Sequence, residues 1–157
     1  MQFRAIAFVC CAPLALLASC AKAPPEKVSL HQDVPPHGGT PVAVGGGQYH
    51  LELVLEPAAG RLQAYLLDNE MEDFVRSSAG RLTIAASAGG SATTLDLAAV
   101  ANPMTGETAS DTSLFAGQSD WLRAHPAFEG VLGPVTIRGT PCPAAAFHFP
   151  AAAKAGP

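Results

Sequence analysis

Apolar and polar residues alternate along residues 49–56, which read Tyr-His-Leu-Glu-Leu-Val-Leu-Glu. A period of two is typical of a β-strand with one face in the core, and it places His50 and Glu52 on the face opposite to the leucines. Residues 57–60, Pro-Ala-Ala-Gly, have the composition of a turn, and residues 61–68 resume an extended pattern. The sequence therefore predicts a β-hairpin here.

Turns rich in glycine and proline divide the rest of the chain into further short β segments. Residues 101–128 are poor in periodicity, and we expect a further strand near residues 112–117 and one helical turn at residues 119–123. This spacing predicts an all-β domain, a single antiparallel β-sandwich of immunoglobulin-like size with about six to eight short strands, over residues 37–150. The other expected strands are residues 40–44, 61–68, 81–87, 92–97, 131–138 and 144–149.

The same patterns predict which side chains enter the core. Leu51, Leu53, Tyr65 and Phe149 are expected to be buried. His148 lies between two phenylalanines, so it points outward if they point inward.

The N-terminus is predicted to be a lipoprotein signal peptide, residues 1–19. Its apolar run is too short to span a bilayer, and it ends in Leu-Ala-Ser-Cys, which resembles the lipobox of bacterial lipoproteins. In that family Cys20 receives the lipid, and Ala21 is typical of sorting to the outer membrane. A plain secretory signal cut before Cys20 is the alternative. Residues 20–36 would then be a lipidated, proline-rich tether, and residues 151–157 a disordered tail.

Cysteine usage and charge narrow the classes of partner. If residues 1–19 are removed and Cys20 is lipidated, only Cys142 remains, and we expect it to be a small buried hydrophobe rather than a redox group. Removal of the signal takes one of 9 basic groups and none of 13 acidic groups, which leaves a formal charge of −5. This acidic balance argues against nucleic acid as a partner, and the lipid on Cys20 is the expected contact with the membrane.

Several histidines are candidates for a metal site. His50 and Glu52 share a strand face, and His37 would lie beside that strand if residues 40–44 pair with it. Together with His148, these nitrogen and oxygen ligands would suit Zn²⁺ or Cu²⁺. The spacing matches no metal-binding signature, so outward polar positions on a sheet are the alternative interpretation.

Other chemistry is weakly indicated. The acidic residues 68–73 lack the pattern and fixed glycine of a calcium loop, so a solvated loop is favoured there. The sequence contains no nucleophile elbow, phosphate loop or dinucleotide fingerprint. We therefore expect no enzyme activity.

Five segments resemble a set of small bacterial envelope lipoproteins: His37-Gly38-Gly39, Tyr-His-Leu-Glu-Leu at residues 49–53, Tyr-Leu-Leu-Asp at residues 65–68, Ala-Asn-Pro-Met-Thr-Gly-Glu-Thr at residues 101–108 and Phe-His-Phe-Pro at residues 147–150. Some members of that set accompany heavy-metal efflux systems, so the resemblance implies a metal role for His37, His50 and Glu52. The expected function is a lipid-anchored periplasmic binding module that takes a transition metal for an envelope efflux system. The alternative is a structural or protein-interaction lipoprotein without a metal site.

Overall fold

The computed structural model describes residues 34–151. The predicted signal peptide, Cys20, the tether up to residue 33 and the tail from residue 152 lie outside the described residues. The elements in chain order are β1 (Thr40–Val44), η1 (Gly45–Gly47), β2 (Tyr49–Glu56), β3 (Arg61–Asp68), β4 (Arg81–Ala88), β5 (Ser91–Ala99), β6 (Leu114–Gln118), α1 (Asp120–Ala124), β7 (Phe128–Leu132), β8 (Val135–Ile137), β9 (Thr140–Cys142) and β10 (Ala145–Phe149).

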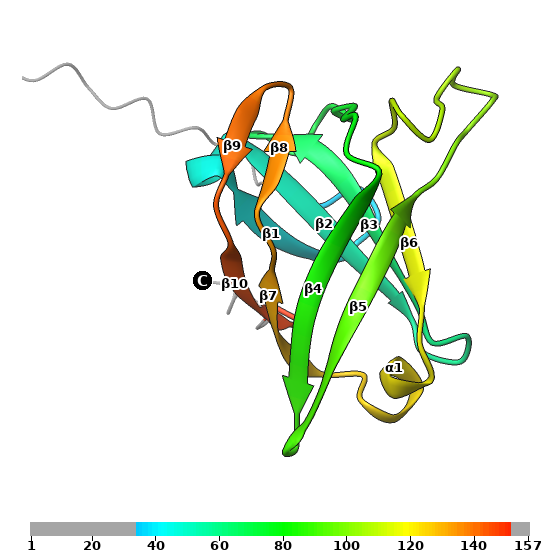
Figure 1. Cartoon of the computed structure of the whole chain (residues 1–157), viewed down its shortest axis with the longest axis vertical. Coiled ribbons are helices and arrows are strands. Elements are labelled where there is room, and N and C mark those ends of the chain that lie inside the picture. Colours follow the sequence, from blue (N-terminus) through cyan, green and yellow to red (C-terminus); the bar gives the residue numbers. More distant parts are fainter. Residues whose placement is uncertain (1–33, 152–157) are drawn as a thin grey trace, which may run out of the picture. The chain divides into compact units, whose positions relative to one another are not determined.

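Eight of the strands form one antiparallel sheet in the order β1-β2-β3-β6-β5-β4-β7-β10, and β8 and β9 form a separate two-stranded ribbon. The large sheet curls until β1 and β10 lie side by side (Figure 1). The backbone N–H of Ala151, just after β10, donates to Oγ1 of Thr40 in β1 at 3.0 Å. The fold class is therefore as predicted: all-β and antiparallel, with a sandwich-like or barrel-like arrangement.

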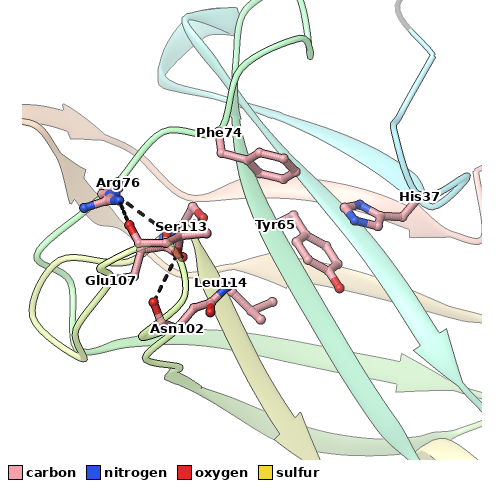
Figure 2. Close-up of a pocket in the computed structure, with 9 residues that line it drawn as sticks. His37, Tyr65, Phe74, Arg76, Asn102, Glu107, Ser113 and Leu114 are labelled. Atoms are coloured by element: carbon pink, nitrogen blue, oxygen red, sulfur yellow. Dashed lines mark hydrogen bonds and ion pairs between the residues drawn. The ribbon is translucent and has the colours of Figure 1, made fainter.

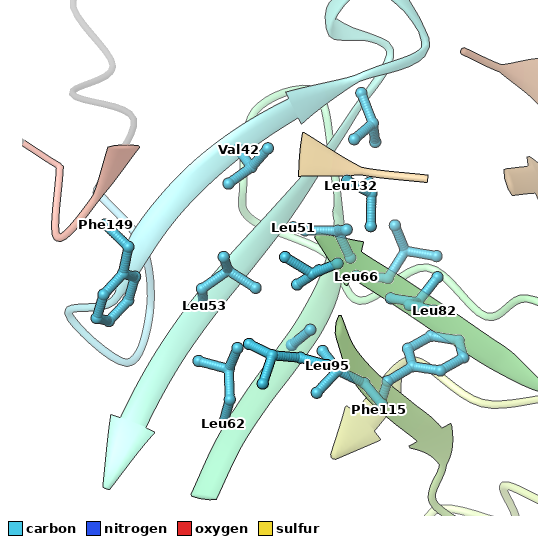
Figure 3. Packing of buried hydrophobic residues seen from close by; sticks show 14 of the residues in the cluster. Val42, Leu51, Leu53, Leu62, Leu66, Leu82, Leu95, Phe115, Leu132 and Phe149 are labelled. Carbon is cyan, nitrogen blue, oxygen red and sulfur yellow. The ribbon is translucent and has the colours of Figure 1, made fainter. Parts of the chain in front are cut away.

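The core fills the inside of the curled sheet (Figure 3). Leu51 and Leu53 of β2 stand opposite Leu66 and Ala64 of β3 in the strand register, and all four side chains are buried. The alternation of side chains thus gives each of these two strands one apolar face, which points into the core. Burial of Leu51, Leu53 and Phe149 confirms that part of the predicted core.

The prediction that Tyr65 belongs to the core is wrong. In the register of β2 and β3, Tyr65 pairs with Glu52, so its ring lies on the outer face of the sheet, where it is half-buried. All four residues from 64 to 67 are apolar or aromatic, so the sequence does not show which face of β3 points into the core. The pairing with β2 decides which residues point inward.

The strand predicted at residues 131–138 is interrupted. It divides into β7 and β8 around Gly133 and Pro134, and the proline cannot donate a hydrogen bond to a neighbouring strand. As a result β7 pairs with β10, while β8 turns back on β9.

The strand and the helical turn expected in the long segment 101–128 are both present, as β6 and α1. The hydroxyl of Ser119 accepts a hydrogen bond from Trp121 N at 3.2 Å and caps α1. No helix within residues 34–151 is long and apolar enough to cross a membrane.

Candidate functional site

A pocket of about 380 Å³ lies on the outer face of the sheet, over β3 and β6 (Figure 2). Three aromatic rings stand on one side of it, and an arginine and a glutamate stand on the other. Its wall is made by His37, Tyr65, Phe74, Arg76, Asn102, Thr105, Glu107, Ser113 and Leu114. Most of these residues come from irregular segments that fold back over the strands.

On the aromatic side, a buried carboxylate holds His37 in place. Glu52 is fully buried, and its Oε2 lies 2.8 Å from Nδ1 of His37. The other oxygen, Oε1, accepts the backbone N–H groups of His37 at 2.7 Å and of Gly39 at 2.8 Å. One side chain therefore fixes both the backbone and the ring of the His37 segment to β2.

The glycines after His37 make this approach sterically feasible. Gly38 has a φ of +68° and lies in a turn, where its backbone N–H donates to Pro35 O at 3.0 Å. A Cβ atom on Gly39 would lie 2.5 Å from Leu53 O and 2.8 Å from Cγ of Glu52. The His-Gly-Gly sequence thus provides a positive φ and then a close backbone contact.

The hydrogen bond to Glu52 defines what the His37 ring offers to a ligand. A carboxylate only accepts, so Nδ1 of His37 carries a proton, and Nε2 has a lone pair whenever the ring is neutral. Nε2 is on the side of the ring away from Nδ1 and makes no hydrogen bond within residues 34–151. The side chain is 36% exposed and lines the pocket. An acceptor nitrogen is therefore available there.

Two further rings complete the aromatic side. The His37 ring stacks on Tyr65 with centroids 3.9 Å apart and planes 16° apart. Phe74 is tilted towards both, with centroids 6.0 Å from His37 and 6.3 Å from Tyr65. Burial and the nearby charge of Glu52 raise the pKa of the Tyr65 phenol, which stays neutral at physiological pH.

On the other side of the pocket, Glu107 is buried and its oxygens are occupied. Its Oε1 accepts from Ser113 N at 2.9 Å and Ser113 Oγ at 2.6 Å, and its Oε2 accepts from Thr105 Oγ1 at 2.8 Å. Burial alone raises the pKa of this carboxyl, but the hydrogen bonds and the charge of Arg76 outweigh it, so the pKa is lowered. Glu107 is therefore ionised at neutral pH.

Arg76 is held among acceptors at the same side of the pocket. Its guanidinium donates to Thr105 O at 2.5 Å and to Asp111 Oδ2 at 3.3 Å, and its Nε lies 3.9 Å from Glu107 Oε1. Two carboxylates therefore surround one guanidinium group.

The structure brings together two of the four residues predicted for a metal site. His37 and Glu52 are in contact, whereas Nδ1 of His50 lies 3.3 Å from Asp68 O and Nδ1 of His148 lies 2.6 Å from Glu129 Oε1. His148 is exposed, in agreement with its expected outward direction. Within the described part of the chain, no three histidine, cysteine, aspartate or glutamate side chains are grouped to hold a metal ion.

Local contacts describe two further segments that the sequence singled out. The acidic segment is organised by Asp68, whose Oδ1 accepts the backbone N–H groups of Glu72 and Asp73 at 3.0 and 3.4 Å, as in a turn. Cys142 is buried as expected, and burial raises the pKa of its thiol.

Sequence reasoning missed Tyr65, Phe74, Arg76 and Glu107 as parts of a site. Arg76 and Glu107 are far apart in the chain, so only the fold places them together. Tyr65 and Glu107 lie in segments of the family resemblance, which gave neither side chain a role in a site. For Phe74, a local signal was the Phe-Val pair at residues 74–75 within a charged segment.

No protein-family model matches the chain, and no curated protein or solved structure is detectably similar to it.

Proposed function

We propose that this protein is a lipid-anchored binding module of the bacterial cell envelope, and that it binds a small ligand in the pocket between His37 and Arg76. Lipidation at Cys20 would place the module at the periplasmic face of the outer membrane. The observation that carries the binding role is the use of Glu52 to orient His37.

Fixing the His37 segment to β2 accounts for the two backbone hydrogen bonds of Glu52, but not for its third contact, with the partly exposed ring of His37. Removing a carboxylate from water is costly unless all its oxygens are hydrogen-bonded, and Glu52 meets that condition through the His37 segment. The result is a fixed, partly exposed imidazole with a free acceptor at the edge of a pocket. Binding sites typically hold a contacting side chain in this way through a second, buried residue.

The proposal is tested by a fragment screen on the full chain in detergent, followed by ligand-observed NMR. We expect hits whose binding is lost in Tyr65→Leu and His37→Ala. Binding should be retained in His148→Ala, a matched histidine control on an exposed part of β10. If every hit binds all four proteins equally, the pocket has no binding role, and the structural or protein-interaction alternative is favoured.

A transition metal, passed to an envelope efflux system, is the second candidate. A carboxylate that accepts the Nδ1 proton is the usual partner behind a metal-ligating histidine, which leaves Nε2 of His37 as the ligand. Glu52 would then orient the ring rather than bind the metal, because both its oxygens are occupied. Water or an efflux component would supply the remaining ligands of Zn²⁺ or Cu²⁺.

Calorimetric titration of the full chain with Zn²⁺ and Cu²⁺ tests this second candidate. Binding that His37→Ala removes and His148→Ala retains would support it. Equal heats for wild-type and His37→Ala would reject it and leave the small-ligand proposal standing.

A further inference from the structure

We propose that the ligand of this pocket is a small organic ammonium ion, with an N–H group that donates to Nε2 of His37 and an apolar body that lies against Tyr65 and Phe74. This inference rests on the proposed binding function and names the class of ligand.

The first argument is the hydrogen-bond polarity of His37. His37 lines the pocket and Glu52 accepts from its Nδ1, so Nε2 of the neutral ring can only accept from a ligand. An acceptor selects a donor, and a carboxylate or phosphate at the same position would place two lone pairs against each other. A protonated amine supplies both the donor and a positive charge, which strengthens the hydrogen bond.

The second argument is the charge around the pocket. Glu107 and Arg76 line the pocket, Glu52 and Asp111 contact the lining residues His37 and Arg76, and Glu56 and Arg61 act on Tyr65. Counted as formal charges, these four carboxylates and two guanidinium groups sum to −2 when the His37 ring is neutral. The guanidinium of Arg76 is already directed to Thr105 O, Asp111 and Glu107. The field in the pocket therefore favours a cation.

The third argument is the aromatic side. A cation within about 6 Å of a ring centroid is attracted to the face of the ring, and more strongly when water is partly excluded. Tyr65 and Phe74 meet at 58° with centroids 6.3 Å apart, which forms a corner rather than a flat surface. Phe74 is 49% exposed, which is unusual for so large an apolar side chain. An ammonium ion with an apolar body would cover it.

A charge-matched series of probes tests the ligand class on the unmodified full chain in detergent, by calorimetry. The probes are benzylammonium, benzyltrimethylammonium, benzyl alcohol and phenylacetate. We expect benzylammonium to bind tightest, benzyl alcohol about tenfold or more weaker because it lacks the charge, and phenylacetate weakest. Benzyltrimethylammonium keeps the charge but has no N–H, so it should fall below benzylammonium.

Variants test the contacts. Phe74→Leu removes a ring at a half-exposed position and should weaken benzylammonium about two- to fivefold. His37→Ala should weaken it about tenfold or more, and His148→Ala should leave it unchanged. Because His37→Ala removes the group that Glu52 holds, Phe74→Leu and the probe series provide evidence that does not depend on that variant.

Several results would overturn the inference. The first is tighter binding of phenylacetate than of benzylammonium. The second is that benzyl alcohol or benzyltrimethylammonium binds with the same affinity as benzylammonium. The third is that Phe74→Leu has no effect on the affinity for benzylammonium. In each of these cases pocket-dependent fragment hits would leave the proposed binding function intact. The absence of any pocket-dependent hit would reject both.

Discussion

Glu52 and Glu107 are buried carboxylates whose oxygens are all hydrogen-bonded, but they act on different neighbours. Glu52 fixes the partly exposed ring of His37, which lines the pocket. Glu107 instead joins the chain segments that precede and follow it, through hydrogen bonds from Thr105 and Ser113. At the scale of single residues, the site is therefore built by carboxylates whose oxygens are already hydrogen-bonded within the protein.

Glu107 should make stability depend on acid. Its pKa in the folded protein is lowered from the ordinary value of 4.5, so its contribution is present above that value and is lost as the pH falls through the lowered pKa. Glu107→Gln should reduce the free energy of unfolding by about 1–3 kcal/mol at pH 7.

The difference between wild-type and Glu107→Gln should shrink as the pH falls below about 4.5. Urea denaturation from pH 7 to 3, followed by fluorescence of the single tryptophan, measures this. The matched control is Glu56→Gln, at an exposed carboxylate, which should change the free energy of unfolding at pH 7 by less than about 0.5 kcal/mol. A constant difference between wild-type and Glu107→Gln would contradict the assignment.

Gly39 should tolerate no side chain. Gly39→Ala places a Cβ 2.5 Å from Leu53 O and should lower the free energy of unfolding by about 1–3 kcal/mol. The matched control is Gly80→Ala, where an added Cβ meets nothing within 4 Å and should raise stability by about 0.4–1 kcal/mol. Unchanged or raised stability in Gly39→Ala would show that the close approach at Gly39 is not maintained in solution.

At the scale of elements, the sequence predicts the strands better than the site. The alternation in β2 and the turn at residues 57–60 place the first hairpin correctly, because local periodicity and turn chemistry determine both. The inward face of β3 depends on its register with β2, which is a non-local property. Phe74, Arg76 and Glu107 lie in irregular segments, where no periodicity indicates which side chains meet.

The register of β2 is tested by two neighbouring substitutions. Leu53 is buried, so Leu53→Ala should cost about 2–5 kcal/mol through the cavity that it leaves. Glu56 is exposed at the end of the same strand, so Glu56→Ala should change stability by less than about 0.5 kcal/mol. Equal losses in the two variants, measured by urea denaturation, would require a shifted register.

At the scale of the whole molecule, the proposed attachment of the module to a membrane depends on Cys20, which lies outside the described residues. Cys20→Ser cannot form the thioether, so we expect an unprocessed precursor or release of soluble protein. Fractionation of cells that express either form, with immunoblotting, measures this. Unchanged partition of Cys20→Ser into the membrane fraction would reject lipidation and favour another means of attachment.

The contact of β1 with β10 bears on aggregation. A sheet with two free edges presents rows of unpaired N–H and C=O groups, which can recruit strands from other molecules. Here the terminal strands lie against each other, and Pro41 in β1 has no N–H to offer. If the proposed lipid anchor holds these molecules in one membrane, they are crowded in two dimensions, where such recruitment would be rapid. The folded module should therefore stay dispersed at high surface density, while truncation before β10 would uncover both edges and promote aggregation.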